Sequence, residues 1–374
     1  MRRYRPDVGI LISETPAVAV GVFTQNQCKA APVLYTQALV PSNRVRAILT
    51  NSGQANAATG DDGIRRNFEM VQAAAKALDC DTEQVLVAST GVIGDPLASE
   101  KIIPSIPELI DRAAETAESF ALAILTTDLV PKTVTTQVQL SQGLVRITGI
   151  SKGSGMIHPN MATMLGYLLT DAELEMDYAG KLLKRATDQS FNMISVDGDS
   201  STNDCCFLMA NGKSKVALKT PEDFENFERA LTDVAIFLAK SIAADGEGAT
   251  KLIEVSIRGS DNLEVARRAA RGVTISPLIK TAIHGEDPNW GRVLARLGAE
   301  QVPFWQLDKM DMFMQGVSII ANGKPQPDVK TELRGLLRQS KIAIEIDLKS
   351  GPLEVTAWGC DLSKKYVDIN TEYS

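Results

Sequence analysis

The chain has 374 residues, of which 44% are hydrophobic and 5% aromatic, a composition typical of a globular protein with a large aliphatic core. Its formal net charge of -7 argues against a nucleic-acid or an anionic-membrane partner, because both need a basic surface. The five cysteines show no Cys-x-x-Cys spacing, and no apolar run reaches the ~18 residues of a membrane span, so we expect a cytoplasmic protein.

The first part of the chain predicts a mixed α/β fold. Short apolar runs at residues 47–50 and 85–88 predict buried strands that end in small or polar loop residues. Residues 64–78 and 107–124 carry apolar side chains at helical spacing and predict helices. Residues 134–150 alternate with period two around a glycine and predict a hairpin that leads directly into a glycine-rich loop.

The second part continues the α/β pattern. After the loop, a strand is expected over 164–170, and helices over 174–189 and 222–242 are separated by an apolar strand at 205–210. Beyond Glu247, four further segments predict a second, smaller α/β unit over about the last third of the chain: 253–258, 262–272, 342–348 and 353–358. The sequence contains no internal repeat and no low-complexity linker between these parts.

The loop between the two parts carries the most informative chemistry. It presents the hydroxyl of Thr163 directly after the small residue Ala162, at the end of a glycine-rich turn. A threonine hydroxyl is a poor nucleophile, but cleavage of the chain before it frees an α-amine that can act as its base. Such an amine titrates at roughly 7.7–8.0, so it accepts a proton near neutral pH. A strand end followed by flexible glycines can strain the peptide bond before Thr163, as an N-to-O acyl shift requires.

The residues around Thr163 resemble a known family. The segment 155–165 is similar to the self-cleavage site of the ornithine acetyltransferases, also called glutamate N-acetyltransferases, of arginine biosynthesis. Further blocks resemble the family in the family's order: 24–33, 51–57, 89–94, 245–251, 287–292 and 358–361. Together they span almost the entire chain, which makes a coincidental likeness very improbable.

The resemblance implies a fold and a processing event. Family members are made as one chain, divide before the threonine and stay associated, typically as two α and two β chains. Here the α chain would be residues 1–162 and the β chain 163–374, with 163–250 completing the catalytic core and about 251–374 forming the smaller domain. The implied architecture is a layered αββα-type sandwich of the self-processing aminopeptidase and ornithine acetyltransferase kind.

The resemblance also implies a reaction. Thr163 would take the acetyl group from N2-acetylornithine and pass it to glutamate, giving ornithine and N-acetylglutamate through an acetyl-Thr163 intermediate. The reaction needs no metal or organic cofactor. Some members also accept acetyl-coenzyme A as donor, and the sequence leaves open whether this chain does.

Three positions are expected to act close to Thr163. A threonine hydroxyl and a glycine amide after a strand can stabilise an oxyanion, and the family places its oxyanion hole at the pair matching Thr90 and Gly91. Lys152 matches a substrate-contacting lysine whose cationic head suits a carboxylate. Judged alone, each also fits an ordinary turn residue.

Other positions match substrate-binding residues of the family. Glu247 lies between two glycines, which we expect to expose its carboxylate to an ammonium group, and Thr126 is favoured over its neighbour Thr127. Asn370 matches a C-terminal asparagine that binds substrate. Relatives carry a hydroxyl residue five places after it, whereas Ser374 stands four places on, so it stays open whether Ser374 takes that contact.

Alternative functions have less support. Only two histidines, His158 and His284, are available for a His-dependent triad, and no Gly-x-Ser-x-Gly motif is present. The acidic segment 197–204 has Thr202 where a calcium-binding loop needs glycine. The alternatives left are a self-processing aminopeptidase or amidase, in which water replaces glutamate, and a non-catalytic binding or assembly protein that never cleaves itself.

Overall fold

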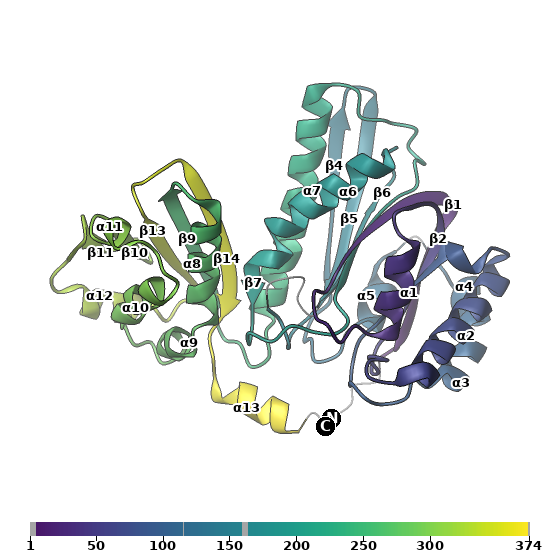
Figure 1. The fold of residues 1–374 in the computed structure, drawn as a ribbon, viewed down its shortest axis with the longest axis horizontal. Coiled ribbons are helices and arrows are strands. Elements are labelled where there is room, and N and C mark those ends of the chain that lie inside the picture. The colour runs from purple at the N-terminus through teal and green to yellow at the C-terminus, as the bar shows by residue number, and fades with distance from the viewer. Residues whose placement is uncertain (1–4, 115, 159–163, 373–374) are drawn as a thin grey trace. The chain divides into compact units, whose positions relative to one another are not determined.

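The computed structural model describes residues 5–114, 116–158 and 164–372, which cluster into two compact units. The first unit comprises Met1–Met156, Asn160–Asp188 and Asp199–Leu238. The second comprises Ile157–Pro159, Gln189–Gly198 and Ala239–Ser374. Each unit has its own sheet (Figure 1), and the predicted α/β class is confirmed.

Within the described residues, the first unit has a seven-stranded sheet in the order β3-β2-β1-β8-β6-β5-β4. Its strands are β1 (Val8–Phe23), β2 (Ser42–Asn51), β3 (Val85–Ser89), β4 (Lys132–Leu140), β5 (Gly143–Lys152), β6 (Leu165–Thr170) and β8 (Cys205–Ala210). The long β1 joins the two halves, because its first part pairs with β2 and its last part pairs with β8. The ends of β3, β5 and β6 supply the loops that carry the candidate site residues.

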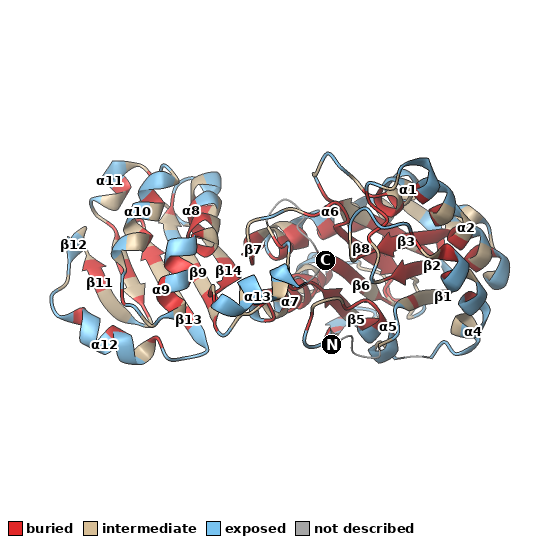
Figure 2. Ribbon diagram, turned by 90° about the horizontal axis from the view of Figure 1, so that it is seen from below, coloured by how far each residue is buried: buried red, intermediate tan, exposed pale blue. Residues whose placement is uncertain are grey.

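Helices cover this sheet in layers. They are α1 (Ala31–Leu39), α2 (Gly60–Leu78), α3 (Ser99–Ile102), α4 (Ile106–Asp111), α5 (Glu118–Ala123), α6 (Met176–Asp188) and α7 (Pro221–Ala244), which runs on into the second unit. The strands are mostly buried while the outward helix faces are exposed (Figure 2). In the core, the ring of Tyr167 packs edge-on against Phe120, with ring centroids 4.9 Å apart, and its hydroxyl lies 2.8 Å from Thr50 Oγ1.

The second unit has a sheet in the order β12-β11-β10-β13-β9-β14-β7. Its strands are β7 (Ile194–Ser195), β9 (Leu252–Ser260), β10 (Asp311–Met314), β11 (Val317–Ala321), β12 (Lys324–Pro325), β13 (Lys341–Asp347) and β14 (Leu353–Cys360). Its helices are α8 (Leu263–Ile275), α9 (Pro277–His284), α10 (Gly291–Ala299), α11 (Phe304–Leu307), α12 (Val329–Leu336) and α13 (Lys364–Thr371).

Most predicted elements are confirmed. The predicted hairpin is β4 and β5, which pair from Lys132↔Ser151 to Leu140↔Gly143. The predicted helix at 262–272 is α8, whose first amides are capped by the Asn262 side chain.

One predicted helix is wrong. The segment 107–124 forms two short helices, α4 and α5. α4 ends at Asp111, and the amide of Ala113 donates to the carbonyl of Ile110, three residues back, at 3.0 Å. The Thr116 hydroxyl accepts from the amide of Glu118 at 3.2 Å just before α5, a local bond of the kind that competes with helix formation.

Candidate active site

Lys152 lies at the centre of a buried group of polar side chains in the first unit. It is the last residue of β5, where it pairs with Leu165 of β6, and it is 2% exposed. Its ammonium donates hydrogen bonds to Thr126 Oγ1 at 2.9 Å and to Thr90 Oγ1 at 3.1 Å. The structure therefore brings together three predicted site residues from three separate sequence blocks, and it is Thr126 rather than Thr127 that meets Lys152.

The Thr90–Gly91 turn is fixed by backbone bonds to the neighbouring block. The amide of Thr90 donates to the carbonyl of Asn51 at 3.0 Å, and that of Val92 donates to the carbonyl of Gly53 at 3.1 Å. Gly91 has φ +135°, and a Cβ there would lie 2.2 Å from the carbonyl carbon of Gly53, so only glycine fits. Because Thr90 Oγ1 accepts from Lys152, its own hydroxyl hydrogen remains able to donate to an oxyanion.

Asp128 connects these residues, and sequence reasoning missed it as a site residue. It is 1% exposed; its Oδ1 accepts from Lys132 Nζ at 2.8 Å and from the Gly153 amide at 2.7 Å. Its Oδ2 accepts from the Thr126 amide at 3.2 Å and lies 3.9 Å from Lys152 Nζ. We call Thr90, Thr126, Asp128, Lys132 and Lys152 the Lys152 cluster.

The electrostatics of the cluster follow from its two lysines. Burial alone would raise the pKa of Asp128, but the charges of Lys152 and Lys132, the hydrogen bond from Lys132 and the Gly153 amide outweigh burial and lower that pKa to about 2. Asp128 is therefore a carboxylate at neutral pH. The side chains of Lys132 and Lys152 both adjoin this one carboxylate in a buried place.

The predicted cleavage site, Ala162 and Thr163, lies outside the described residues, as does Ser374. The residue after Thr163 is held on both sides. Met164 donates its amide to Asp204 Oδ1 at 3.0 Å, and its carbonyl accepts from the Cys205 amide at 3.2 Å. These bonds fix the start of β6 against β8.

Asp204 is itself fully buried beside Met164. Burial raises its pKa well above the usual range, and the Met164 and Ser201 amides together with the charge of Lys152 offset only part of that effect. Its Oδ2 makes no hydrogen bond within the described residues. The sequence pattern around Asp204 indicates at most a calcium loop and does not reveal this burial.

Glu247 and Asn370 meet in the second unit. Glu247 follows α7 and is 9% exposed, and its Oε2 accepts from Asn370 Nδ2 at 2.8 Å. Asn370 is an exposed residue of α13, and its Nδ2 also donates to the carbonyl of Tyr366 at 3.0 Å. Two residues predicted to bind substrate are thus partners of each other.

The glycines beside Glu247 do not act as expected. We expected them to expose its carboxylate and to let a ligand approach closely, but other segments of the protein pack against them instead. A Cβ at Gly248, which has φ +71°, would lie 2.5 Å from the amide nitrogen of Tyr366, and one at Gly246 would lie 2.8 Å from Cys360 Sγ. Ser363 Oγ also donates to the carbonyl of Gly248 at 2.6 Å, so α13 packs directly on the Glu247 loop.

Both histidines belong to the second unit and have structural partners there. His284 Nδ1 lies 2.7 Å from Asp361 Oδ2. Asp361 also accepts from Thr250 Oγ1 at 2.6 Å and from the Lys251 amide at 2.8 Å, which anchors the chain just after the Glu247 loop. His158 Nδ1 lies 3.5 Å from Ser195 Oγ. Among the residues that the structure describes, no group of three or more His, Cys, Asp or Glu side chains could hold a metal ion.

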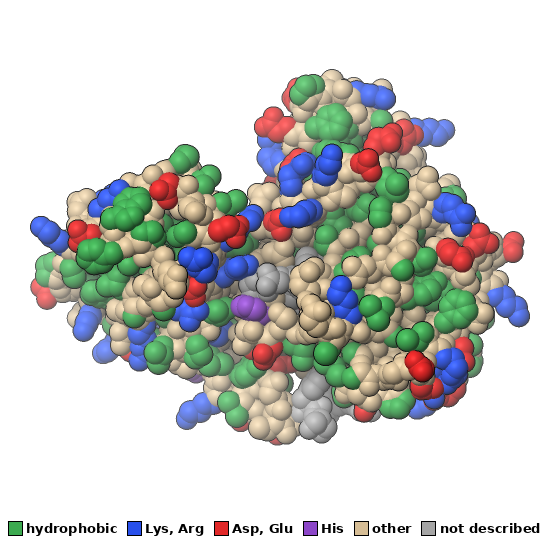
Figure 3. Space-filling model, in the orientation of Figure 1, with side chains coloured by type: hydrophobic (Ala, Val, Ile, Leu, Met, Phe, Trp, Pro, Cys, Tyr) green, Lys and Arg blue, Asp and Glu red, His purple; other side chains and the backbone are tan. Residues whose placement is uncertain are grey.

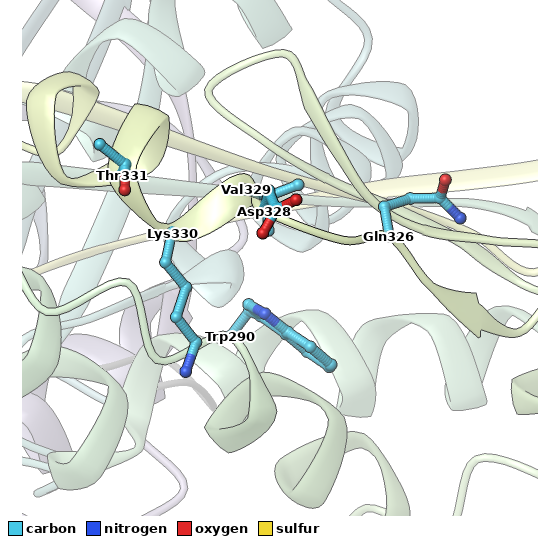
Figure 4. Close-up of a pocket in the computed structure, with 6 residues that line it drawn as sticks. All are labelled: Trp290, Gln326, Asp328, Val329, Lys330 and Thr331. Carbon is cyan, nitrogen blue, oxygen red and sulfur yellow. The ribbon is translucent and has the colours of Figure 1, made fainter.

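A surface hollow of about 550 Å³ occurs elsewhere in the second unit (Figure 4). Its lining mixes one ring, two opposite charges and neutral groups: Trp290, Gln326, Asp328, Val329, Lys330 and Thr331. No residue of the Lys152 cluster or of the Glu247–Asn370 pair lines it, so the hollow is not a candidate for the chemistry. On the face drawn in Figure 3, cationic and anionic side chains are interspersed over both units.

Comparison with known proteins identifies the family. The ArgJ family model matches residues 1–374. The chain belongs to the ArgJ family. A relative from Dehalococcoides mccartyi, named arginine biosynthesis bifunctional protein ArgJ, is 45% identical over 98% of this chain and 91% of its own length. A relative of the same name from Thermotoga neapolitana is 43% identical over 100% of this chain and 96% of its own length.

A solved ArgJ structure agrees with this assignment. The crystal structure of the arginine biosynthesis bifunctional protein from Bacillus halodurans matches with a TM-score of 0.54 and 38% identity, covering 56% of this chain and 100% of that chain. Membership of the ArgJ family makes the protein an acyltransferase of arginine biosynthesis, which confirms the family predicted from the sequence blocks. No helix among the described residues is both long and apolar enough to cross a bilayer.

Proposed function

We propose that the protein cleaves itself between Ala162 and Thr163 and then transfers an acetyl group from N2-acetylornithine to glutamate through an ester on Thr163. The observation that carries this proposal is the convergence of the Thr90 and Thr126 hydroxyls on the ammonium of Lys152. Family membership supports the same reaction.

The proposed steps use groups of known chemistry. The α-amine freed by cleavage takes the hydroxyl proton of Thr163 as its oxygen attacks the acetyl carbonyl. The Thr90 hydroxyl and the Gly91 amide stabilise the oxyanion, each contributing on the order of 3 kcal/mol. Lys152 polarises the Thr90 hydroxyl and, with Thr126, holds the substrate. Ornithine leaves with the proton, and glutamate then removes the acetyl group by the reverse sequence.

A denaturing gel and mass spectrometry test the cleavage. The purified protein is expected to give two fragments that divide between Ala162 and Thr163, while Thr163→Ala is expected to remain a single chain. A wild-type protein that is active and uncut would refute the proposal. Gel filtration of the cut protein tests the predicted assembly of two α and two β chains.

Kinetics test the transfer and separate it from its closest alternative. We expect ping-pong kinetics and an acetyl label on Thr163 when N-acetylornithine is supplied alone. A self-processing amidase would release ornithine equally fast with and without glutamate, because water would accept the acyl group. Repeating the assay with acetyl-coenzyme A shows whether it also serves as donor.

A further inference from the structure

The carboxylate of Asp128 accepts hydrogen bonds from two backbone amides next to the Lys152 ammonium and its partners, those of Gly153 and Thr126. Its Oδ1 accepts from the amide of Gly153, the residue directly after Lys152, at 2.7 Å. Its Oδ2 accepts from the amide of Thr126 at 3.2 Å. The hydroxyl of the same threonine accepts a hydrogen bond from the Lys152 ammonium. One carboxylate thus sets the positions of the donor and of one of its acceptors.

The side chain of Asp128 is fully buried and lies beside two lysine side chains. The side chains of Asp128, Lys132 and Lys152 are 0%, 1% and 3% exposed. Lys132 begins β4 and its Nζ lies 2.8 Å from Asp128 Oδ1, while Lys152 Nζ lies 3.9 Å from Oδ2. A nearby negative charge stabilises a buried ammonium, and Asp128 supplies one beside both lysines.

The other ionisable groups near this carboxylate do not replace it. Arg5 reaches only the backbone carbonyl of Asp128, at 3.1 Å. Asp204 also interacts with Lys152, but its Oδ1 accepts from the Met164 amide and its Oδ2 makes no hydrogen bond within the described residues, so it does not hold Gly153 or Thr126.

We propose that Asp128 is a positioning residue of the acetyl transfer, which holds the Lys152 ammonium charged and aimed at the hydroxyls of Thr90 and Thr126. This inference rests on the proposed function, since it concerns how Lys152 acts in that reaction. Asp128 touches no substrate in this scheme and acts only through Lys152, Gly153 and Thr126.

Asp128→Asn provides the first test. The amide keeps the size of the side chain and one acceptor but removes the charge beside both lysines. We expect kcat/KM for acetyl transfer to fall about 100-fold at pH 8, with a smaller loss at pH 6. Opposite charges within ~4–6 Å shift a titration by 1–3 units, so the alkaline limb of the pH profile should move down by at least about one unit. An unchanged profile and rate would overturn the proposal.

Two further variants distinguish charge from shape. Asp128→Glu restores the charge but displaces it by one methylene, so the wild-type pH profile should return while kcat stays reduced. Lys132→Met leaves one carboxylate for one ammonium, and its activity should stay within about tenfold of the wild type. If Asp128→Glu kept the shifted pH profile of Asp128→Asn, the charge role would be refuted.

The remaining controls keep the experiment interpretable. Thermal unfolding of each variant shows whether it folds, and if Asp128→Asn does not, Asp128→Asn combined with Lys132→Met removes both members of that ion pair. This double variant should show the same lowered alkaline limb, and a wild-type profile in it would overturn the proposal. The same assay also measures the wild type. If the wild-type protein transferred no acetyl group, the proposed function would be refuted instead.

Discussion

The Lys152 cluster and the Glu247–Asn370 pair are held in place by different means. The first is fixed at the end of β5 by a fully buried carboxylate with four polar neighbours from two chain segments, 126–132 and 152–153. In the second, Glu247 is joined to Asn370, an exposed residue near the end of α13, and Ser363 at the start of that helix bonds the Glu247 loop. Changes in the first region should therefore act on the rate of the chemical step, and changes in the second should act in a graded way on substrate affinity.

The same contrast is seen in the glycines. In the first region, Gly91 is required by the close backbone of Gly53, in the neighbouring block to which the Thr90–Gly91 turn is hydrogen-bonded. In the second, Gly248 is required by the approach of α13, an element that can fray. A glycine substitution should thus distort the predicted oxyanion site in one case and loosen a helix in the other.

The largest effect is expected for Lys152→Met. It removes the ammonium that donates hydrogen bonds to the hydroxyls of Thr90 and Thr126. Loss of an electrostatic group at an oxyanion site costs about 10²–10³ in rate, so kcat should fall about 10³-fold. Lys181→Met on the exposed face of α6 is the matched control and should leave kcat unchanged. Comparable rates for the two variants would show that the buried region does not control the chemistry.

Gly91→Ala should come next. The added Cβ would lie 2.2 Å from the carbonyl carbon of Gly53, so the turn must move and kcat should fall about 100-fold. Gly94 is the control in the same turn, because it has φ +91° but no atom within 4 Å of an added Cβ. Gly94→Ala should cost only about 1 kcal/mol of backbone strain and keep most of the activity. Steady-state kinetics and thermal unfolding of both variants measure the difference.

Glu247→Gln tests the second region. The amide still accepts from Asn370 but loses the charge that we expect to bind a substrate ammonium, an interaction worth roughly 1.5–3 kcal/mol. KM for N-acetylornithine should rise at least about tenfold with little change in kcat, the pattern of lost uniform binding. A fall in kcat at constant KM would mean that this region takes part in the chemical step and would remove the contrast.

The sequence predicted the parts of the fold that depend on local patterning. The hairpin of β4 and β5 and the strands β3, β6 and β8 follow from period-two or continuous apolar runs. The long β1 was not predicted, because it contains Pro16 and exchanges one partner strand for another along its length. The break between α4 and α5 involves local bonds, such as those at Ile110 and Thr116, that periodicity does not reveal.

The candidate site likewise contains residues that the sequence predicted and residues that only the structure reveals. Thr90, Thr126 and Lys152 were found because their sequence blocks resemble a family, and the structure adds that they meet. Asp128 has Lys132 four residues on, which reads as an ordinary local ion pair. Its contact with Gly153 depends on how strands pair, and so does the position of Asp204 beside Met164. Such long-range arrangements cannot be read from spacing.

The smallest effect is expected for Ser363→Ala. Ser363 caps α13 by accepting from the Lys365 amide at 3.2 Å, and its hydroxyl donates to the carbonyl of Gly248 at 2.6 Å. Loss of a cap costs about 1 kcal/mol, so α13 should fray and KM should rise about threefold while kcat stays constant. Ser276→Ala is the matched control, because Ser276 occupies the N-cap of α9 in the same unit without a side-chain cap bond. An equal response to both variants would mean that the position of α13 does not set the affinity, and the second region would then have to be held by more than this helix.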